Sequence, residues 1–367
     1  MKHFSAFAYM RFVYFVILIL IHTSGLLAQD VSFSQPYASP VFLNPAFAGN
    51  VDGLRISMNH RRQWNSIPGT FNASVFSADW REACLSSGLG IIAVRDVEGE
   101  GFLNTSQFGL VYSFGIPVSK NGFLSTGFTG SYASKTIDWK YLEFSDQFDP
   151  VLGKVAPVSS NGIPFTQSRT FADVDAGIVY KHSGMYNGKE ILSNIGFSAH
   201  HLTRPDESIL GLKTRLPIKY SLHGGFMMPV KKYSTSQGTF IFPHFVYTRQ
   251  AKLSEILVGA YAFRAPFLVG LSYANAETPA NVENTNALVA MIAFQQPFHK
   301  GFSYQLGYSF DLNLSGMSLS TYGSHEISLN IVFDGVSVFC NAFGGGFKDK
   351  WSTKCVRGSK KGYMPQF

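Results

Sequence analysis

Apolar and polar positions alternate along most of this chain, and residues 323–333 show the pattern most clearly. Aliphatic or aromatic side chains occupy every second position from Ile327 to Phe333. The intervening positions Glu326, Ser328 and Asn330 are polar. One face therefore suits hydrocarbon and the other suits water. An aromatic ring at the end of such a strand is typical of a membrane barrel at the headgroup level, although this strand alone equally fits a soluble sandwich.

Similar short segments recur from residue 54 onward and predict an even number of strands, fourteen. Their polar faces carry mostly Ser, Gly and Asn, whereas a soluble sandwich would place Lys, Glu and Thr outside. Pro243 predicts a bulge or a shortened strand where it falls. The predicted strands are residues 54–60, 70–79, 87–94, 105–114, 122–133, 172–181, 191–201, 218–228, 239–248, 254–263, 267–274, 287–296, 301–311 and 324–333.

The connections between these strands alternate in length. Nearly all the long ones fall on one side if the chain enters its first strand from the periplasm, and the longest is 134–171. Bacterial barrels have short periplasmic turns and longer extracellular loops, and an even strand number returns the C-terminus to the periplasm. The pattern predicts an all-β fold: a transmembrane antiparallel up-and-down β-barrel of about 14 strands over residues 54–333.

Composition supports a membrane barrel. Charged residues make up 14% of the 367 residues, against about 25% in average soluble proteins. Aromatic residues make up 15%, and few charges are left to coat a soluble surface. Beyond the N-terminus, every apolar run is interrupted by charges or glycines before it reaches the roughly 20 residues of a spanning helix. These features exclude a helical membrane protein and predict an outer-membrane location.

Residues 1–28 resemble a secretory signal peptide. Lys2 and Arg11 precede an apolar run over residues 12–21, and Ala28 offers a small residue at the cleavage point. A retained anchor is the alternative, but the run is too short to span a bilayer. We therefore expect the mature chain to begin near residue 29 in the cell envelope.

Two further segments flank the predicted barrel. Residues 29–53 contain three prolines that exclude a long strand or helix, so we expect a periplasmic lead-in or a plug across the barrel mouth. Residues 334–367 form a basic tail that accounts for much of the net charge of +7. The tail would lie in the periplasm and bind a lipoprotein or peptidoglycan, unless it is a solvated, disordered end. Nucleic acid is not an expected partner of an exported chain.

The three cysteines leave two arrangements open. Cys340 and Cys355 can close a disulfide in the tail and leave Cys84 free, or all three can be thiols. Residue 29 is not a cysteine, so lipid anchoring after signal cleavage is not indicated.

Neither a catalytic nor a metal site stands out, and no cofactor or enzyme activity is predicted. His200 and His201 are adjacent in a predicted strand, so their side chains should face opposite sides and not share one ion. Ser221 and His223 share a face, but no nucleophile or oxyanion hole is marked. Charged and polar side chains that should point into the lumen, and pair there, are Arg55, Asn59, Asp173, Asp175, Lys219 and His223.

Several short motifs resemble, in order, the PorP/SprF family of outer-membrane proteins of the Bacteroidetes type IX secretion and gliding system. They lie within residues 43–49, 61–71, 200–205, 216–223 and 323–333. The family usually has Tyr where this chain has His60, and loop 134–171 and the tail match no family segment. The motif residues, which are candidates for partner binding, are Asn44, Pro45, Arg61, Gln63, Trp64, Pro68, Gly69, His200, His201, Arg204 and Pro205.

The resemblance implies an outer-membrane barrel that binds the C-terminal region of a secreted adhesin and helps to export it or retain it at the cell surface. Other type IX secretion components would be its partners. A transporter or channel for small or hydrophobic solutes is the alternative, with residues 29–53 as its plug. Trp64 can be an interfacial anchor, a partner contact or simple loop packing.

Overall fold

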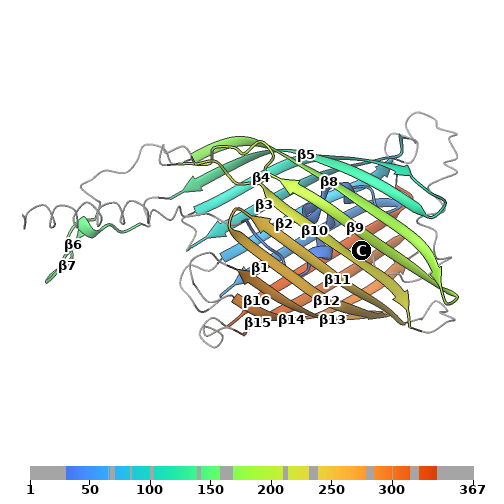
Figure 1. The fold of residues 1–367 in the computed structure, drawn as a ribbon. Helices are drawn as coiled ribbons and strands as arrows, with labels where there is room; N and C mark the ends of the chain where they lie inside the picture. Colours follow the sequence, from blue (N-terminus) through green and yellow to red (C-terminus); the bar gives the residue numbers. More distant parts are fainter. Residues whose placement is uncertain are drawn as a thin grey trace, which may run out of the picture. The chain divides into compact units, whose positions relative to one another are not determined.

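Fourteen long antiparallel strands close into one barrel in the computed structural model of this chain (Figure 1). The structure describes residues 30–64, 66, 71–82, 85–99, 103–138, 142–157, 168–209, 214–230, 239–277, 285–299, 301–314 and 322–336. The predicted signal peptide, Pro68, Gly69, all three cysteines and the tail beyond residue 336 lie outside these ranges. The barrel strands are β1 (Gly53–Gln63), β2 (Phe71–Glu82), β3 (Ser87–Glu98), β4 (Leu103–Pro117), β5 (Gly122–Ile137), β8 (Ser168–Tyr186), β9 (Lys189–His200), β10 (Lys219–Pro229), β11 (Thr239–Gln250), β12 (Leu253–Arg264), β13 (Phe267–Glu277), β14 (Thr285–His299), β15 (Phe302–Asn313) and β16 (Ser324–Asp334).

Closure depends on the first and last strands, which pair along their whole lengths. The register runs from Gly53 opposite Asp334 to Gln63 opposite Ser324. Every other neighbour in the barrel follows in chain order, except that β5 pairs with β8 because β6 (Phe148–Asp149) and β7 (Gly153–Lys154) form a separate hairpin in between. A closed sheet leaves no unpaired edge, as a lipid environment requires. The predicted strand number and topology are confirmed.

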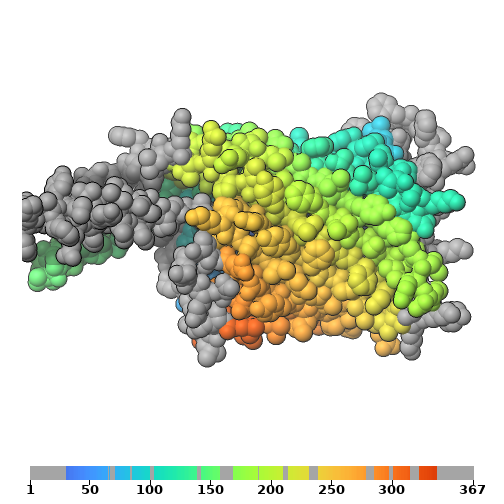
Figure 2. All heavy atoms as spheres, viewed as in Figure 1, coloured from blue at the N-terminus to red at the C-terminus, as the bar shows by residue number. Residues whose placement is uncertain are grey.

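Alternation along each strand separates an apolar exterior from a polar interior. On β15, Leu306 is 51% exposed and Tyr308 40%, whereas Ser309 is fully buried. On β5, Phe128 is 52% exposed while Thr129 faces inward at 3%. Apolar side chains therefore cover the outer wall and small polar ones line the interior, as expected of a wall in contact with lipid. Figure 2 shows one side of this outer wall with all heavy atoms drawn. None of the helices in the described ranges is long and apolar enough to cross a membrane.

One strand departs from the prediction. We expected Pro243 to introduce a bulge or to shorten its strand, but β11 continues through it, with Pro243 opposite Ala260 of β12. The ladder to β10 has no paired positions between Gly225 opposite His244 and Met228 opposite Ile241. The prediction was wrong because the missing N–H of a proline affects pairing with only one neighbouring strand, and the other ladder keeps its register.

Residues 31–50, here called the inner segment, lie within the barrel (Figure 1, blue). They form three short helices: η1 (Pro36–Ala38), α2 (Pro40–Leu43) and η2 (Pro45–Phe47). Each begins with a proline, whose fixed φ suits a first helical position. Apolar side chains of the segment are buried against the inner face of the wall: Phe47 is fully buried and Tyr37 is 2% exposed.

The connections differ in length at the two ends of the barrel. At the end where β1 finishes, the connections 138–167 and 201–218 are the longest, and we call this the outer end. At the opposite end, β8 and β9 are joined only by Asn187 and Gly188, both at positive φ, and β12 and β13 by residues 265–266. The two longest connections thus share one end, as expected if that end is extracellular. The connection 251–252 at the outer end and the connection 230–238 at the opposite end depart from this contrast in length.

Candidate functional site

The inner segment is fixed to the wall first by a cluster of charged side chains, here called the acidic clamp (Asn59, Arg61, Asp311 and Glu326). Glu326 accepts the backbone N–H groups of Ser34 at 2.7 Å and Gln35 at 3.0 Å, one on each carboxylate oxygen. Asn59 donates to the same carboxylate at 2.8 Å. Arg61 bridges Glu326, at 3.3 Å, and Asp311, at 2.6 Å, and also contacts the Ser34 hydroxyl.

A second buried ion pair holds the end of the segment. Arg55 on β1 donates from Nε and Nη2 to the two oxygens of Asp79 on β2, both at 3.0 Å. The same guanidinium donates to the Phe47 carbonyl at 3.1 Å, and Asp79 accepts the Gly49 N–H at 2.8 Å. Both charged side chains are at most 1% exposed. The pair thus satisfies backbone groups of the inner segment that would otherwise be buried without partners.

Asn44 is the third anchor. Its amide donates to the carbonyls of Ile178 on β8 at 3.2 Å and Phe197 on β9 at 3.1 Å. It also lies 3.1 Å from Nε2 of His223, and its own Oδ1 accepts the Ala46 N–H. Asn44 therefore joins two strands to the first turn of η2, while Pro45 begins that turn.

Glycines in the wall make room for this contact. A Cβ at Gly177 would lie 2.0 Å from Oδ1 of Asn44, and one at Gly127 would lie 2.4 Å from the Ala46 nitrogen. A Cβ at Gly88 would lie 2.2 Å from the Ala48 carbonyl oxygen. No side chain fits at these distances, so three different strands carry glycine where the inner segment touches them.

Aromatic contacts complete the packing of the segment. The ring of Tyr37 meets Phe242 edge-on at a centroid distance of 5.2 Å and His244 at 5.7 Å. Burial raises the pKa of the Tyr37 phenol above its ordinary value, because the phenolate would lose its hydration. Lys219 donates to the Val31 carbonyl at 3.1 Å, with its ammonium 5.7 Å from the Phe42 ring centre.

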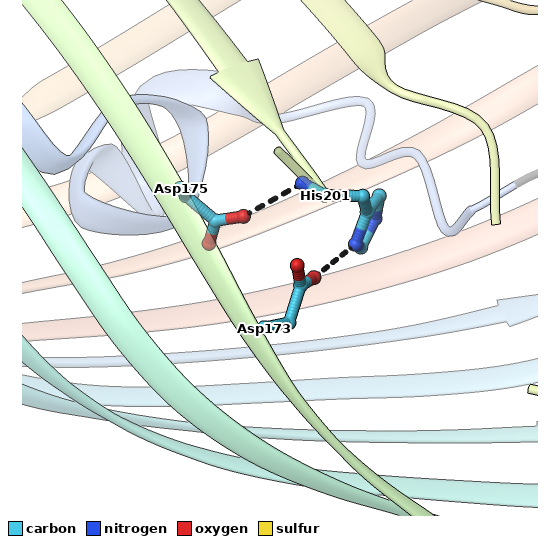
Figure 3. Close-up of side chains that lie close together, drawn as sticks. All are labelled: Asp173, Asp175 and His201. Atoms are coloured by element: carbon cyan, nitrogen blue, oxygen red, sulfur yellow. Dashed lines mark hydrogen bonds and ion pairs between the residues drawn. The ribbon is translucent and has the colours of Figure 1, made fainter. Parts of the chain in front are cut away.

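A separate cluster lies at the outer end of the lumen (Figure 3). Asp173 and Asp175 share a face of β8, and His201 immediately follows β9. His201 contacts Asp173 through Nδ1 and donates its backbone N–H to Asp175 at 3.0 Å. Nδ1 of His200 lies 3.6 Å from Oδ2 of Asp175, and the Thr203 hydroxyl donates to Asp173 at 2.6 Å.

This cluster corrects the expectation that His200 and His201 face opposite sides. The strand ends at His200, and His201 adopts a left-handed conformation with φ of 61°. Strict alternation does not extend past a strand end, so the His201 imidazole contacts Asp173 while the His200 imidazole lies beside the neighbouring Asp175. Sequence reasoning had named all four residues but had not brought them together.

The remaining motif residues of this region lie in the connection 201–218. Arg204 is exposed and donates its N–H to the His201 carbonyl at 3.0 Å, while the Pro205 carbonyl accepts the Leu216 N–H at 2.9 Å. The connection is tied to the wall by ion pairs at 2.7 Å and 3.1 Å, Lys135 to Glu207 and Arg169 to Asp206. These contacts give this outer connection a defined shape.

The first outer connection contains Gln63 and Trp64. Trp64 has a φ of 58° and donates its backbone N–H to the Gly323 carbonyl at 3.0 Å. Its ring meets Phe71 edge-on at 5.3 Å, a local packing contact. Gln63, the last residue of β1, is partly exposed.

The possible Ser221 and His223 pair lies deep in the packed interior. His223 is fully buried, packs on Phe47 at 5.3 Å and lies 3.1 Å from the Asn44 amide. Its imidazole thus belongs to the seat of the inner segment. The sequence did not indicate Ser34, Gln35, Asp79, Asp311 and Glu326 as anchors of the inner segment. For the three acidic residues, a charged side chain on a strand face of otherwise small polar residues was a signal of such a role.

Comparison with known protein families identifies the chain. Residues 26–331 match the model described as "Type IX secretion system membrane protein PorP/SprF". The chain belongs to the PorP/SprF family. This confirms the resemblance found from the motifs, and the closed barrel with its apolar exterior makes this PorP/SprF protein an outer-membrane component of the type IX secretion system. Other components of that system are accordingly its partners.

Solved structures similar to this PorP/SprF barrel are bacterial outer-membrane proteins. A FadL homologue of Pseudomonas aeruginosa is 12% identical over 81% of this chain and 94% of its own, with a TM-score of 0.41. The toluene transporter TodX of Pseudomonas putida is 7% identical over 84% and 95%, with a TM-score of 0.42. The toluene transporter TbuX of Ralstonia pickettii is 10% identical over 83% and 94%, with a TM-score of 0.39. A comparison with curated proteins found no match.

Proposed function

We propose that this PorP/SprF protein binds the C-terminal region of a secreted adhesin at its outer end and helps to export the adhesin or retain it at the cell surface. The observation that carries the proposal is the contrast between its lumen and its outer end. The inner segment is held in the lumen by the acidic clamp, by Arg55 with Asp79 and by Asn44. The outer end carries the longest connections, so docking there is favoured over passage through the barrel.

The β6–β7 hairpin offers a contact surface in the longest connection. The Asp149 carboxylate accepts the N–H groups of Val151 and Leu152 at 2.8 and 2.9 Å, which fixes the turn. Gln147 braces its base, accepting the Phe144 N–H at 2.7 Å. Val151 is 89% exposed and Leu152 77%. Two exposed aliphatic side chains on a preformed turn suit an apolar pocket on a partner.

The proposal is tested by changing the hairpin tip. The double variant Val151→Asp and Leu152→Asp should reduce recovery of the adhesin from detergent-solubilised membranes at least about 10-fold, because a buried hot-spot contact is worth about 1.4 kcal/mol or more. The matched control is Leu85→Asp with Val118→Asp, which changes two exposed aliphatic residues at the opposite end. The control should recover as much adhesin as the wild type.

Two results would contradict adhesin binding. One is an unchanged amount of every secreted adhesin on the surface of cells that lack the gene. The other is a pull-down in which the wild-type barrel brings down no adhesin. A periplasmic lipoprotein or peptidoglycan bound through the tail would be lost on truncation after Asp334, independently of the hairpin.

A solute transporter is the competing function. Its lumen would have to open, and the buried contacts of the inner segment count against that. Ion conductance or uptake of an apolar solute by the reconstituted wild-type barrel would favour transport, whereas a closed wild-type barrel would favour docking.

A further inference from the structure

Three metal-ligating side chains, Asp173, Asp175 and His201, converge at the outer end of the lumen (Figure 3), and His200 lies beside Asp175. Ligand atoms of Asp173, Asp175 and His201 all lie within 4.8 Å of one another. Nδ1 of His200 lies 3.6 Å from Oδ2 of Asp175. Asp173 is 2% exposed and Asp175 7%, so this is an enclosed cluster and not a solvated surface group.

The two carboxylates require positive charge. Within the described residues, the ion-pair partners of Asp173 and Asp175 are histidines. Two buried carboxylates without full compensation of their charge are costly, and a bound cation would supply that compensation. The basic side chains Lys135 on β5 and Arg169 on β8 form ion pairs with other carboxylates, those of Glu207 and Asp206.

The hydrogen bonds of Ser198 indicate where the cation should lie. Ser198 donates its single hydroxyl proton to the Leu43 carbonyl at 2.8 Å. The hydroxyl oxygen must therefore accept from Nε2 of His200, which lies 3.2 Å away. Nε2 then carries a proton, and Nδ1 is the ring atom directed toward the Asp175 carboxylate. At 3.6 Å this contact is too long for a hydrogen bond, and the nitrogen and the oxygen are spaced as two ligands of one cation would be.

We propose that Asp173, Asp175, His200 and His201 bind one divalent transition-metal ion of the zinc type. Two carboxylates and two imidazoles suit zinc, whereas calcium prefers an all-oxygen shell. In a tetrahedral site with bonds of about 2.1 Å, ligand atoms lie roughly 3.4 Å apart, close to the 3.6 Å between His200 and Asp175. The other ligand atoms reach this spacing by small side-chain adjustments, in which Nδ1 of His201 moves away from Asp173 and the more distant pairs close.

The surroundings resemble an outer coordination shell. Ser198 holds the far nitrogen of His200, and the Thr203 hydroxyl holds an oxygen of Asp173. Such contacts fix the tautomer and orientation of metal ligands. The ion would join β8 to the start of the connection 201–218 and so fix the base of that outer loop.

The test uses the full chain without a histidine tag, purified in detergent and stripped with EDTA. Zinc chloride is added, unbound ion is removed, and metal is measured by atomic emission. We expect one zinc per chain, and cobalt in its place should give the visible absorption of a four-coordinate ion with nitrogen and oxygen ligands. Asp173→Asn and His201→Asn should each weaken zinc binding at least about 10-fold, since even outer-shell changes cost that much.

His182→Asn is the matched control, because His182 is exposed on the same strand and its ring packs against Tyr180, away from the two carboxylates. It should bind zinc as the wild type does. A wild-type chain that retains no zinc and gives no cobalt spectrum overturns the proposal, whether or not the variants fold. Equal loss of zinc in the control and ligand variants overturns it as well, because the bound metal would then be adventitious. Heat-dependent mobility on a denaturing gel verifies that each variant is a folded barrel.

Discussion

Replacing Glu326 by Gln should release the inner segment from the lumen. Each carboxylate oxygen of Glu326 is faced by donors: Oε2 by Ser34 N and Arg61 Nη1, and Oε1 by Gln35 N and Asn59 Nδ2. A Gln side chain has one NH₂ group, and in either orientation that group would point at two donors. The substitution keeps the shape of the side chain and removes its charge. It leaves one buried backbone donor and one side-chain donor without an acceptor.

The magnitude follows from the burial of the cluster. Glu326 is 1% exposed, and removal of one partner from a buried charge cluster costs about 3–5 kcal/mol. Part of that cost falls on the wall strands, but the lost backbone contact belongs to the inner segment. A loss of about 3 kcal/mol in docking shifts the released population roughly 100-fold, since 1.4 kcal/mol corresponds to a factor of ten.

Cysteine labelling measures this release. Ser39 is 2% exposed in the middle of the inner segment, so Ser39→Cys in a background with the native cysteines changed to Ser gives a thiol that reacts only when the segment leaves its seat. The rate of modification by a charged maleimide should rise roughly 100-fold in Glu326→Gln, in line with the population estimate. The reconstituted variant should also conduct ions where the wild type does not.

Glu277→Gln is the control, because Glu277 is an exposed carboxylate at the end of β13. It should label at the wild-type rate. The reasoning fails if Glu326→Gln labels within a few-fold of the wild type while the barrel remains folded by heat-dependent mobility. It fails equally if the control rises as much.

Two further substitutions test the seat and the second anchor. Gly177→Ala should displace the inner segment, since the added Cβ would lie 2.0 Å from Oδ1 of Asn44. Gly130→Ala should have no effect, because a Cβ there would meet no other part of the protein within 4 Å. Ser39→Cys labelling compares the two variants, and equal labelling rates would refute the steric argument. Arg55→Ala should destabilise the barrel by about 3–5 kcal/mol by leaving the Asp79 carboxylate buried without a cation. Urea unfolding in detergent, monitored by tryptophan fluorescence, measures the loss, and an unchanged midpoint would contradict it.

The barrel could be predicted from the sequence because its physical signal is local. Lipid selects apolar side chains at every second position, so Leu306 and Tyr308 alternate with Gln305 and Ser309 within a few residues of one another. A stretch of a few residues is therefore enough to predict that the segment is a strand and which side chains face the lipid. Most predicted strands were shorter than the observed ones, as for β8, which begins at Ser168 and not at residue 172.

The contacts of the lumen could not be predicted in the same way. Glu326 was assigned correctly to a polar face, but the backbone groups that it binds at Ser34 lie 292 residues away. No periodicity connects them. His201 presents a similar limit, since its left-handed backbone is a feature of the loop after β9 and not of its residue type.

The placement of the family motifs bears on where specificity arises. Asn44, Pro45 and Arg61 are buried, and the polar groups of Asn44 and Arg61 bind the inner segment to the wall. A side chain whose donors and acceptors are used inside the chain contributes to the shape of the barrel and is not free to recognise a partner. We infer that choice of cargo depends on exposed outer positions such as Arg204 and the hairpin tip. Exchange of those connections between two members of the family should therefore change the bound adhesin, while exchange of their inner segments should leave it unchanged.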